Sequence, residues 1–163
     1  GVPVELGLNT CILEDQYGFI LHHQVMVGQT DDGVAVPMVE QTKARFPTLK
    51  QCSFDQGFYS PNNRSKLRGL LDLSILPSKG RRSKQEEAFE TSDAFVVARR
   101  QHASVESAIN ALEVHGLDRC LDHGIDGFKR YVALAVVARN IQKVGSFMQK
   151  KEAKAHKRRK KAA

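Results

Sequence analysis

Apolar residues form short alternating runs in the first half of the chain and recur at helical spacing in the second half. The apolar positions of 4–11 and 19–27, joined by a segment that ends in Asp-Gln-Tyr-Gly, predict an antiparallel β-hairpin. The range 30–44 opens with a threonine and two acids, which suit the start of a helix. We expect a helix there, with a kink or a late start at Pro37.

Two further strands are predicted where short β-compatible runs stand between turn residues, at 49–54 and 73–76. Between them, Ser60 and Pro61 form a good helix start, because proline is favoured at the first helical position. The order of hairpin, helix, strand, helix, strand and helices predicts an α/β fold with a mixed sheet flanked by helices. The remaining helices are expected at 84–89, 93–113 and 128–144.

Composition describes an ordinary globular chain with a cationic end. The 163 residues are 41% hydrophobic and 26% charged, which is enough for one domain with a tail. The chain has 25 Lys and Arg residues and 18 acids, for a net charge of +7. Nine of the basic residues but only one acid, Glu152, lie from Lys143 onwards, which gives this end a net charge of +8. The preceding residues therefore carry a net charge of −1. Such an asymmetry favours nucleic acid over an anionic membrane surface here, since no large apolar face accompanies it. A solvated, disordered end explains the same run equally well.

Cysteine usage and hydropathy indicate in which cellular compartment the protein resides. Three cysteines without a CxxC motif favour a reducing environment, and the longest apolar run, 131–138, is too short to span a bilayer. We therefore expect a soluble, cytoplasmic chain with no membrane partner. His115, Cys120 and His123 could in principle hold zinc, but a tetrahedral site needs a fourth ligand, so a loop with a partly buried thiol is the simpler interpretation.

Two acids stand where metal ligands are useful. Asp55 follows a predicted strand and begins a glycine-containing loop, the place where an open α/β sheet presents functional groups. Glu106 lies on a polar strip of a predicted helix. Carboxylates of this kind bind Mg²⁺, and two such ions can clamp the attacking and leaving oxygens of a phosphoryl displacement. From residue types alone, a turn aspartate and a solvated glutamate remain the commoner explanations.

Longer runs of sequence around these two acids strengthen the hypothesis that they are metal ligands. The run CSFDQGFYSP at 52–61 resembles the D-x-G-F segment around the second catalytic aspartate of bacterial insertion-sequence transposases of the DDE type. The runs SKGRR at 78–82 and RRQHASVESAIN at 99–110 are similar to the segment that leads to their third acid. HGLDR at 115–119 and GFKRYVALA at 127–135 continue the likeness, which covers about residues 1–145.

The resemblance implies an RNase H-like fold, with 1–145 as the C-terminal part of the catalytic domain and 146–163 as a basic, disordered tail. It assigns Asp55 as the second catalytic, metal-binding acid and Glu106 as the third. The first acid belongs on a strand before the hairpin, so we expect it upstream of Gly1, in an N-terminally truncated domain. The family's arginine and lysine around the third acid are replaced here by His102 and Glu113.

Basic residues near these acids are expected to contact DNA phosphates and so to position DNA without reading its sequence. The family implies Mg²⁺, which Mn²⁺ can replace, and double-stranded DNA as the partner, both at element ends and at the target. A homo-oligomer on DNA and association with the bacterial nucleoid are compatible with this expectation. The expected DNA-binding residues are Lys79, Arg81, Arg82, Arg99, Arg100 and Arg119.

The leading hypothesis is a DNA transposase, an enzyme that cleaves and transfers DNA strands of an insertion element. This chain alone is expected to be inactive, because two carboxylates hold two metal ions poorly. One alternative is an inactive remnant that only binds DNA, and another is an RNase H-like nuclease that never joins strands. The joined DNA product separates the transposase from the nuclease.

Overall fold

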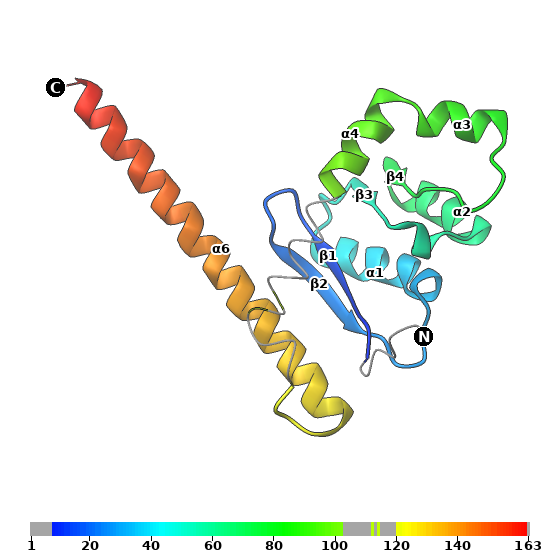
Figure 1. Cartoon of the computed structure of the whole chain (residues 1–163), viewed down its shortest axis with the longest axis horizontal. Helices are drawn as coiled ribbons and strands as arrows, with labels where there is room; N and C mark the ends of the chain where they lie inside the picture. The colour runs from blue at the N-terminus through cyan, green and yellow to red at the C-terminus, as the bar shows by residue number, and fades with distance from the viewer. Residues whose placement is uncertain (1–7, 103–111, 113, 115–119, 163) are drawn as a thin grey trace, which may run out of the picture.

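The computed structural model describes residues 8–102, 112, 114 and 120–162. Figure 1 shows two small strand pairs with helices around them and one long helix, α6, which extends well beyond the rest. The described elements make a mixed α/β fold, in agreement with the class that the sequence predicts.

The hairpin consists of β1 (Thr10–Glu14) and β2 (Ile20–Val25), which pair antiparallel. Its turn is organised by Asp15, whose Oδ1 accepts hydrogen bonds from the backbone N–H groups of Tyr17 and Phe19, both at 2.9 Å. Gly18 has φ +81°, a conformation that favours glycine. Because this turn begins at Asp15, the first strand extends to Glu14, beyond the predicted end at residue 11. The second strand lies within the predicted range.

Helix α1 (Asp31–Arg45) packs against both strand pairs. Its buried Val34 lies with Leu13 of β1 in one apolar cluster, and its buried Val39 lies with Phe54 and Leu67 in another. Pro37 lies inside the helix on its exposed face, so the predicted late start does not occur. One helix therefore joins the hairpin to the rest of the fold.

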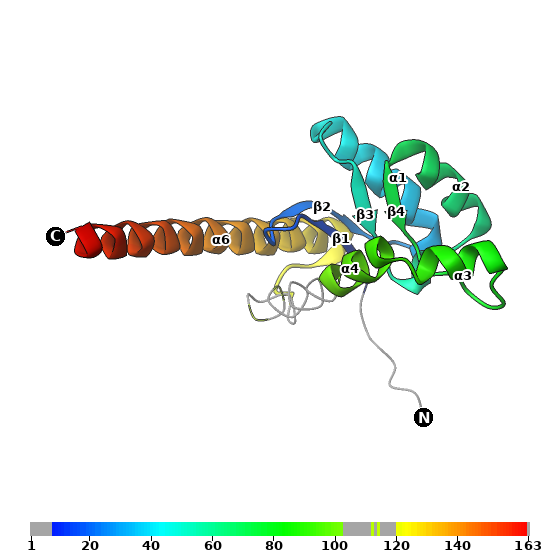
Figure 2. The same ribbon diagram turned by 90° about the horizontal axis from the view of Figure 1, so that it is seen from above.

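The second strand pair is parallel. It consists of β3 (Gln51–Ser53) and β4 (Leu73–Ile75), connected through α2 (Pro61–Leu70). The hydroxyl oxygen of Ser60 accepts a hydrogen bond from the backbone N–H of Asn63 at 3.2 Å, and Pro61 takes the first helical position, as expected. Figure 2 shows α1 and α2 on one side of this pair and the following helices on the other.

Those following helices are α3 (Lys84–Glu90) and α4 (Asp93–His102). Helix α3 begins with a capping box, in which Ser83 and Glu86 bond to each other's backbone N–H groups. The same hydrogen bonds lower the pKa of Glu86. Glu86 also pairs with Arg64 of α2, so α3 is tied to the helix on the other side of the sheet. The rest of the helix predicted over 93–113 falls largely outside the described residues.

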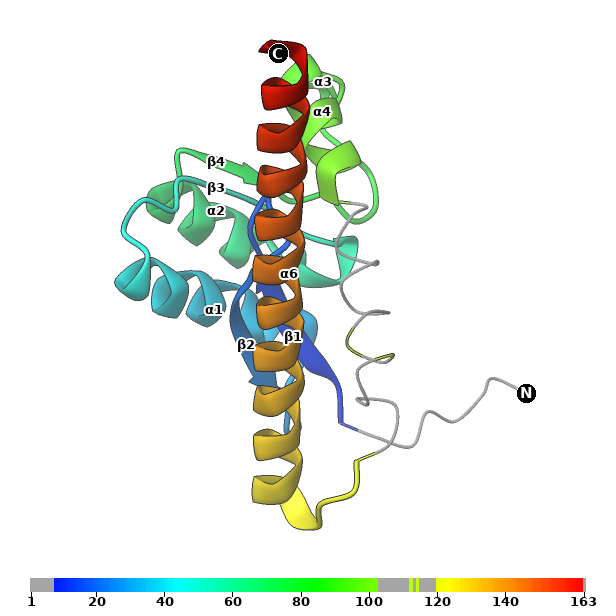
Figure 3. The same cartoon turned by 90° about the vertical axis from the view of Figure 1, so that its left-hand side faces the viewer.

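Helix α6 (Gly124–Ala162) crosses the hairpin and continues past it (Figure 3). Asn140 binds the backbone of Ile20 twice, accepting from its N–H and donating to its carbonyl, each at 3.0 Å. Nearer the hairpin turn, Phe147 stacks on Phe19 with ring centroids 5.7 Å apart. Ile20 is also buried with Ala135 and Val136 of the helix.

The end of α6 differs from the disordered tail expected over 146–163, because helix continues to Ala162. After Gly145 the sequence contains no glycine or proline and is rich in lysine, arginine and alanine, which favour helix. The boundary at residue 145 thus falls within an element, and the division into a domain and a tail stays a prediction.

The mixed sheet is represented by two separate pairs among the described residues, β1–β2 and β3–β4. The expected five-stranded RNase H-like sheet remains a proposal. Within the same part of the chain, no helix combines the length and the apolar character that crossing a membrane requires.

Leu67 is a test of the core behind the parallel strands. It is fully buried among Val39, Phe54 and Leu76. Replacing it with alanine is expected to lower the free energy of unfolding by about 2–5 kcal/mol, because the lost contacts leave a cavity. Urea denaturation followed by circular dichroism measures this, with the exposed neighbour Lys66→Ala as the matched control. Equal stability of the two variants would contradict the described packing.

Candidate functional site

The candidate site lies at the carboxyl ends of β3 and β4, which meet at one edge because the strands are parallel. Asp55 follows β3 after the buried Phe54 and has an exposed side chain. A single 3-10 turn, η1 (Gln56–Phe58), begins immediately after it. Asp55 thus lies just after a strand, at the start of a loop, as the sequence predicts. Its role as a metal ligand stays a prediction.

The two strand ends are joined by contacts between the segments that follow them. Gln56 donates from Nε2 to the carbonyl oxygen of Ser78 at 2.8 Å. Lys79, which is exposed, reaches from the β4 side to the carbonyl oxygen of Gly57 with its Nζ at 3.4 Å. Lys79 therefore lies against the loop that begins at Asp55, close to the acid beside which it is expected to contact DNA.

A second carboxylate lies against the same loop. An added Cβ at Gly57 would come within 2.5 Å of Oδ2 of Asp31, in the first turn of α1. A side chain at this position would have to displace that exposed carboxylate, so Asp31 lies in close contact with the loop. The sequence marked Asp31 only as a helix-start residue, and no local pattern shows that it returns to the loop of Asp55.

Glu90 at the end of α3 anchors the β4 side of the site. Its buried carboxylate accepts from the backbone N–H of Ser78 through Oε1 at 2.8 Å, and its Oε2 lies 3.1 Å from Nε of Arg82. Sequence reasoning missed Glu90, because a glutamate in a predicted helix is usually solvated. Its burial depends on how α3 folds back on the segment after β4.

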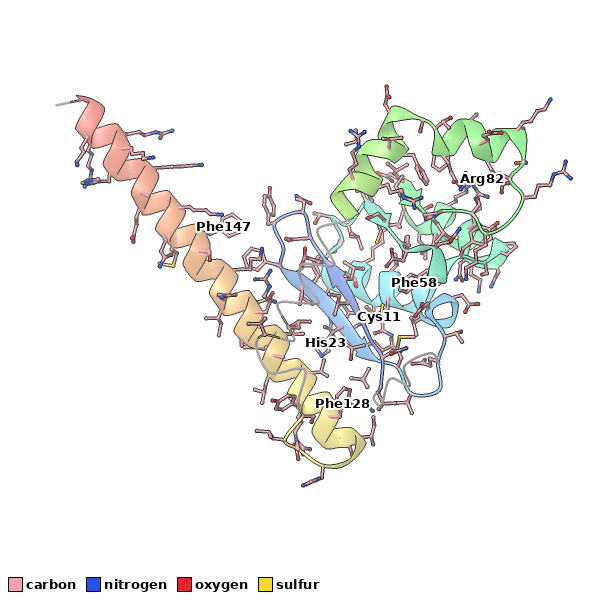
Figure 4. All side chains as sticks on the ribbon, viewed as in Figure 1. Cys11, His23, Phe58, Arg82, Phe128 and Phe147 are labelled. Atoms are coloured by element: carbon pink, nitrogen blue, oxygen red, sulfur yellow. The ribbon has the colours of Figure 1, made fainter. Side chains whose placement is uncertain are left out.

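Three of the predicted DNA-contacting arginines line one pocket of about 320 Å³, which lies between the end of α3, helix α4 and the segment before α3. Arg99 and Arg100 are exposed on α4, and Arg82 enters from the segment before α3, at the corner labelled in Figure 4. Apolar atoms of Phe95 and Val96 form part of its wall. Glu90 is paired to Arg82, and within the described residues no carboxylate is paired with the guanidinium groups of Arg99 and Arg100, which suits a bound anion such as a phosphate.

Other predicted residues are placed less fully. Arg81 is exposed in the same segment as Arg82. Glu106 and Arg119 lie outside the described residues, as do His115 of the zinc alternative and Glu113. His102 ends α4.

Two thiols lie beneath this edge. Burial raises the pKa of Cys11 to about 12, with a further contribution from the charge of Asp31, and burial raises that of Cys52 to about 12 as well. Both therefore stay protonated at neutral pH and are poor nucleophiles. Cys52 and Phe58 contact both apolar clusters, so they belong to the packing that joins the hairpin to the parallel strands. Phe58 and Cys11 are labelled in Figure 4.

The donor set has the right chemistry for a hard cation but is incomplete in the described part of the chain. Asp55 offers carboxylate oxygens, which Mg²⁺ prefers. No cluster of three or more His, Cys, Asp or Glu side chains that could hold a metal occurs there. What the described geometry supports directly is an edge that presents Asp55, with Asp31 against the same loop, near several cations.

Comparisons with known proteins add no assignment: no family model matches this chain, and no curated protein or solved structure does either.

Removing the carboxylate of Glu90 is expected to loosen this edge. Glu90→Ala leaves the buried N–H of Ser78 without its acceptor and should lower the free energy of unfolding by about 1–3 kcal/mol. Glu90→Gln keeps an acceptor and should cost less, while exposed Glu87→Ala on the same helix serves as the control. Urea unfolding distinguishes them, and equal costs for Glu90→Ala and Glu87→Ala would mean that the Ser78 contact contributes little.

Proposed function

We propose that this chain is the C-terminal part of the catalytic domain of a DDE-type DNA transposase. The observation that carries the proposal is the position of Asp55 at the carboxyl end of a parallel strand, at the start of the loop that Lys79 contacts. The arginine pocket is linked to this loop through Glu90, which binds Ser78, and Ser78 in turn accepts from Gln56. An acid that ligates metal and cations that hold phosphates are both needed where a DNA strand is cut and joined.

The arrangement of strands supports the proposal independently of the site residues. The hairpin and the parallel pair both pack on α1, yet in the described residues no strand joins β1 to β3. A strand between them would convert two pairs into one mixed sheet of five. In the proposal that strand precedes the hairpin and carries the first catalytic aspartate, whose end would then lie beside Asp55.

In this proposal Asp55 and Glu106 hold Mg²⁺, which would polarise the phosphate and activate the attacking oxygen. The roles of the basic residues are to hold and orient the DNA backbone. Lys79, packed against the loop of Asp55, positions the phosphate nearest the metal, and Arg99 and Arg100 bind a phosphate farther along the strand.

The catalytic test uses a longer chain that includes the upstream strand and DNA carrying the element's terminal repeats. Asp55→Ala is expected to lower strand transfer in Mg²⁺ on the order of 100-fold or more, since a metal ligand is lost. Asp72→Ala, an exposed acid before β4, should leave the joined product unchanged. Cleavage without any joined product in the unaltered chain would favour the nuclease instead.

The DNA-binding test needs no catalysis and uses the 163-residue chain. Arg99→Gln with Arg100→Gln should reduce the slope of log affinity against log salt by about 2, because each lost phosphate contact contributes about 1. Exposed Arg68, at the end of α2 and away from the carboxyl edge, supplies the Arg68→Gln control. An unchanged slope in the double variant would remove the pocket from the DNA interface. If a longer chain binds DNA normally but does not transfer strands, the alternative of an inactive remnant that only binds DNA would be favoured.

A further inference from the structure

Helix α6 carries a second apolar surface that faces away from the protein. Its buried face includes Val132, Ala135 and Val136, of which the last two pack with Ile20 of the hairpin. In Figure 1 the other labelled elements lie on one side of this helix, and in Figure 3 the helix stands in front of them. On the opposite side, five large apolar residues are between 48% and 67% exposed, and we call them the α6 stripe: Leu134, Val137, Ile141, Val144 and Met148.

The spacing of the α6 stripe is that of helix pairing. Its members follow one another at intervals of three, four, three and four residues, the a/d pattern with which two helices pack along a common seam. At a rise of 1.5 Å per residue the stripe extends over about 21 Å. Its flanking positions at Ala138 and Gly145 are small and uncharged, which permits close approach of a second helix.

We propose that the α6 stripe is a dimerisation surface for a second copy of this chain, with the two α6 helices antiparallel. The distribution of charge along α6 favours this antiparallel orientation of two copies. A parallel pair would place two basic ends side by side, each with the same lysine and arginine run after Gln149. An antiparallel pair separates these ends by the length of the stripe and also aligns the helix dipoles favourably.

The antiparallel arrangement has a complementary contact at each end. Arg130 and Glu152 are each eleven residues from Ile141, on the face of the helix that carries the stripe. A pair centred near Ile141 therefore brings Arg130 of one copy, whose guanidinium also contacts Asp122 of its own chain at 2.9 Å, opposite Glu152 of the other, twice by symmetry. The hairpin packs on the far face of α6, so it does not obstruct the partner.

The size of the surface sets the expected affinity. One seam of about 21 Å buries less than the roughly 1,600 Å² of a standard stable interface, so we expect a weak dimer that dissociates on dilution. The proposal does not depend on the proposed function, because it concerns the free chain.

Sedimentation of the 163-residue chain without DNA tests the proposal, in about 0.5 M salt so that contacts of the basic ends are screened. Ile141→Glu places a charge at the centre of the seam and should weaken dimerisation at least about tenfold. Gln149→Glu adds the same charge to the same helix outside the stripe and should have little effect. Circular dichroism checks that both variants fold, which is expected since both positions are exposed.

Disulfide trapping tests the orientation, in a chain with Cys120→Ser. Chains with Leu134→Cys mixed with chains with Met148→Cys should cross-link to each other under mild oxidation, whereas Met148→Cys alone should not. Efficient cross-linking of Met148→Cys with itself would overturn the antiparallel arrangement. If the chain is a monomer at all concentrations, the proposal is wrong; this is the result expected if another segment of a longer protein covers the stripe instead. A dimer that Ile141→Glu does not weaken would also overturn the proposal.

Discussion

The packing of α1 on two separate strand pairs is the interaction on which the rest of this fold depends. Val34 buries one side of the helix against the hairpin, and Val39 buries another among residues of β3 and α2. Two-stranded pairs are marginal alone in water, so neither is expected to persist without this common support. The position of Asp55 follows from it, because Phe54 just before this acid belongs to the same core.

The order of elements was predictable because it rests on local signals. The Asp-Gln-Tyr-Gly turn, the Ser60-Pro61 helix start and the runs that form β3 and β4 each specify structure within a few residues. The position of Asp55 was predictable for the same reason, because it depends only on where β3 ends along the chain. The end of the first strand was not, because the side chain of Asp15 determines where the turn begins.

Contacts between distant segments could not be inferred in this way. The approach of Asp31 to Gly57 depends on how α1 is set against η1, and the burial of Glu90 depends on how α3 returns to Ser78. Glu90 is of a residue type that suggests a solvated acid, yet tertiary packing buries it. Asp31 stays exposed, and packing determines only that its carboxylate lies against Gly57. The arginines were named individually from the sequence, but that Arg82 would share a pocket with Arg99 and Arg100 is a property of the fold.

Helix α6 shows how one regular element can serve several surfaces. Residues three and four apart share a face, so Asn140 and Phe147 can hold the hairpin while Ile141 and Met148 point elsewhere. The helix then continues without support from the hairpin into a run of basic residues. An isolated helix of like charges repels itself and is marginal in water, so its order must come from the anchored part. A partner along the α6 stripe would lengthen that anchored part and hold the basic ends apart, so the same contact that joins two copies would also fix where their charges can meet an anion.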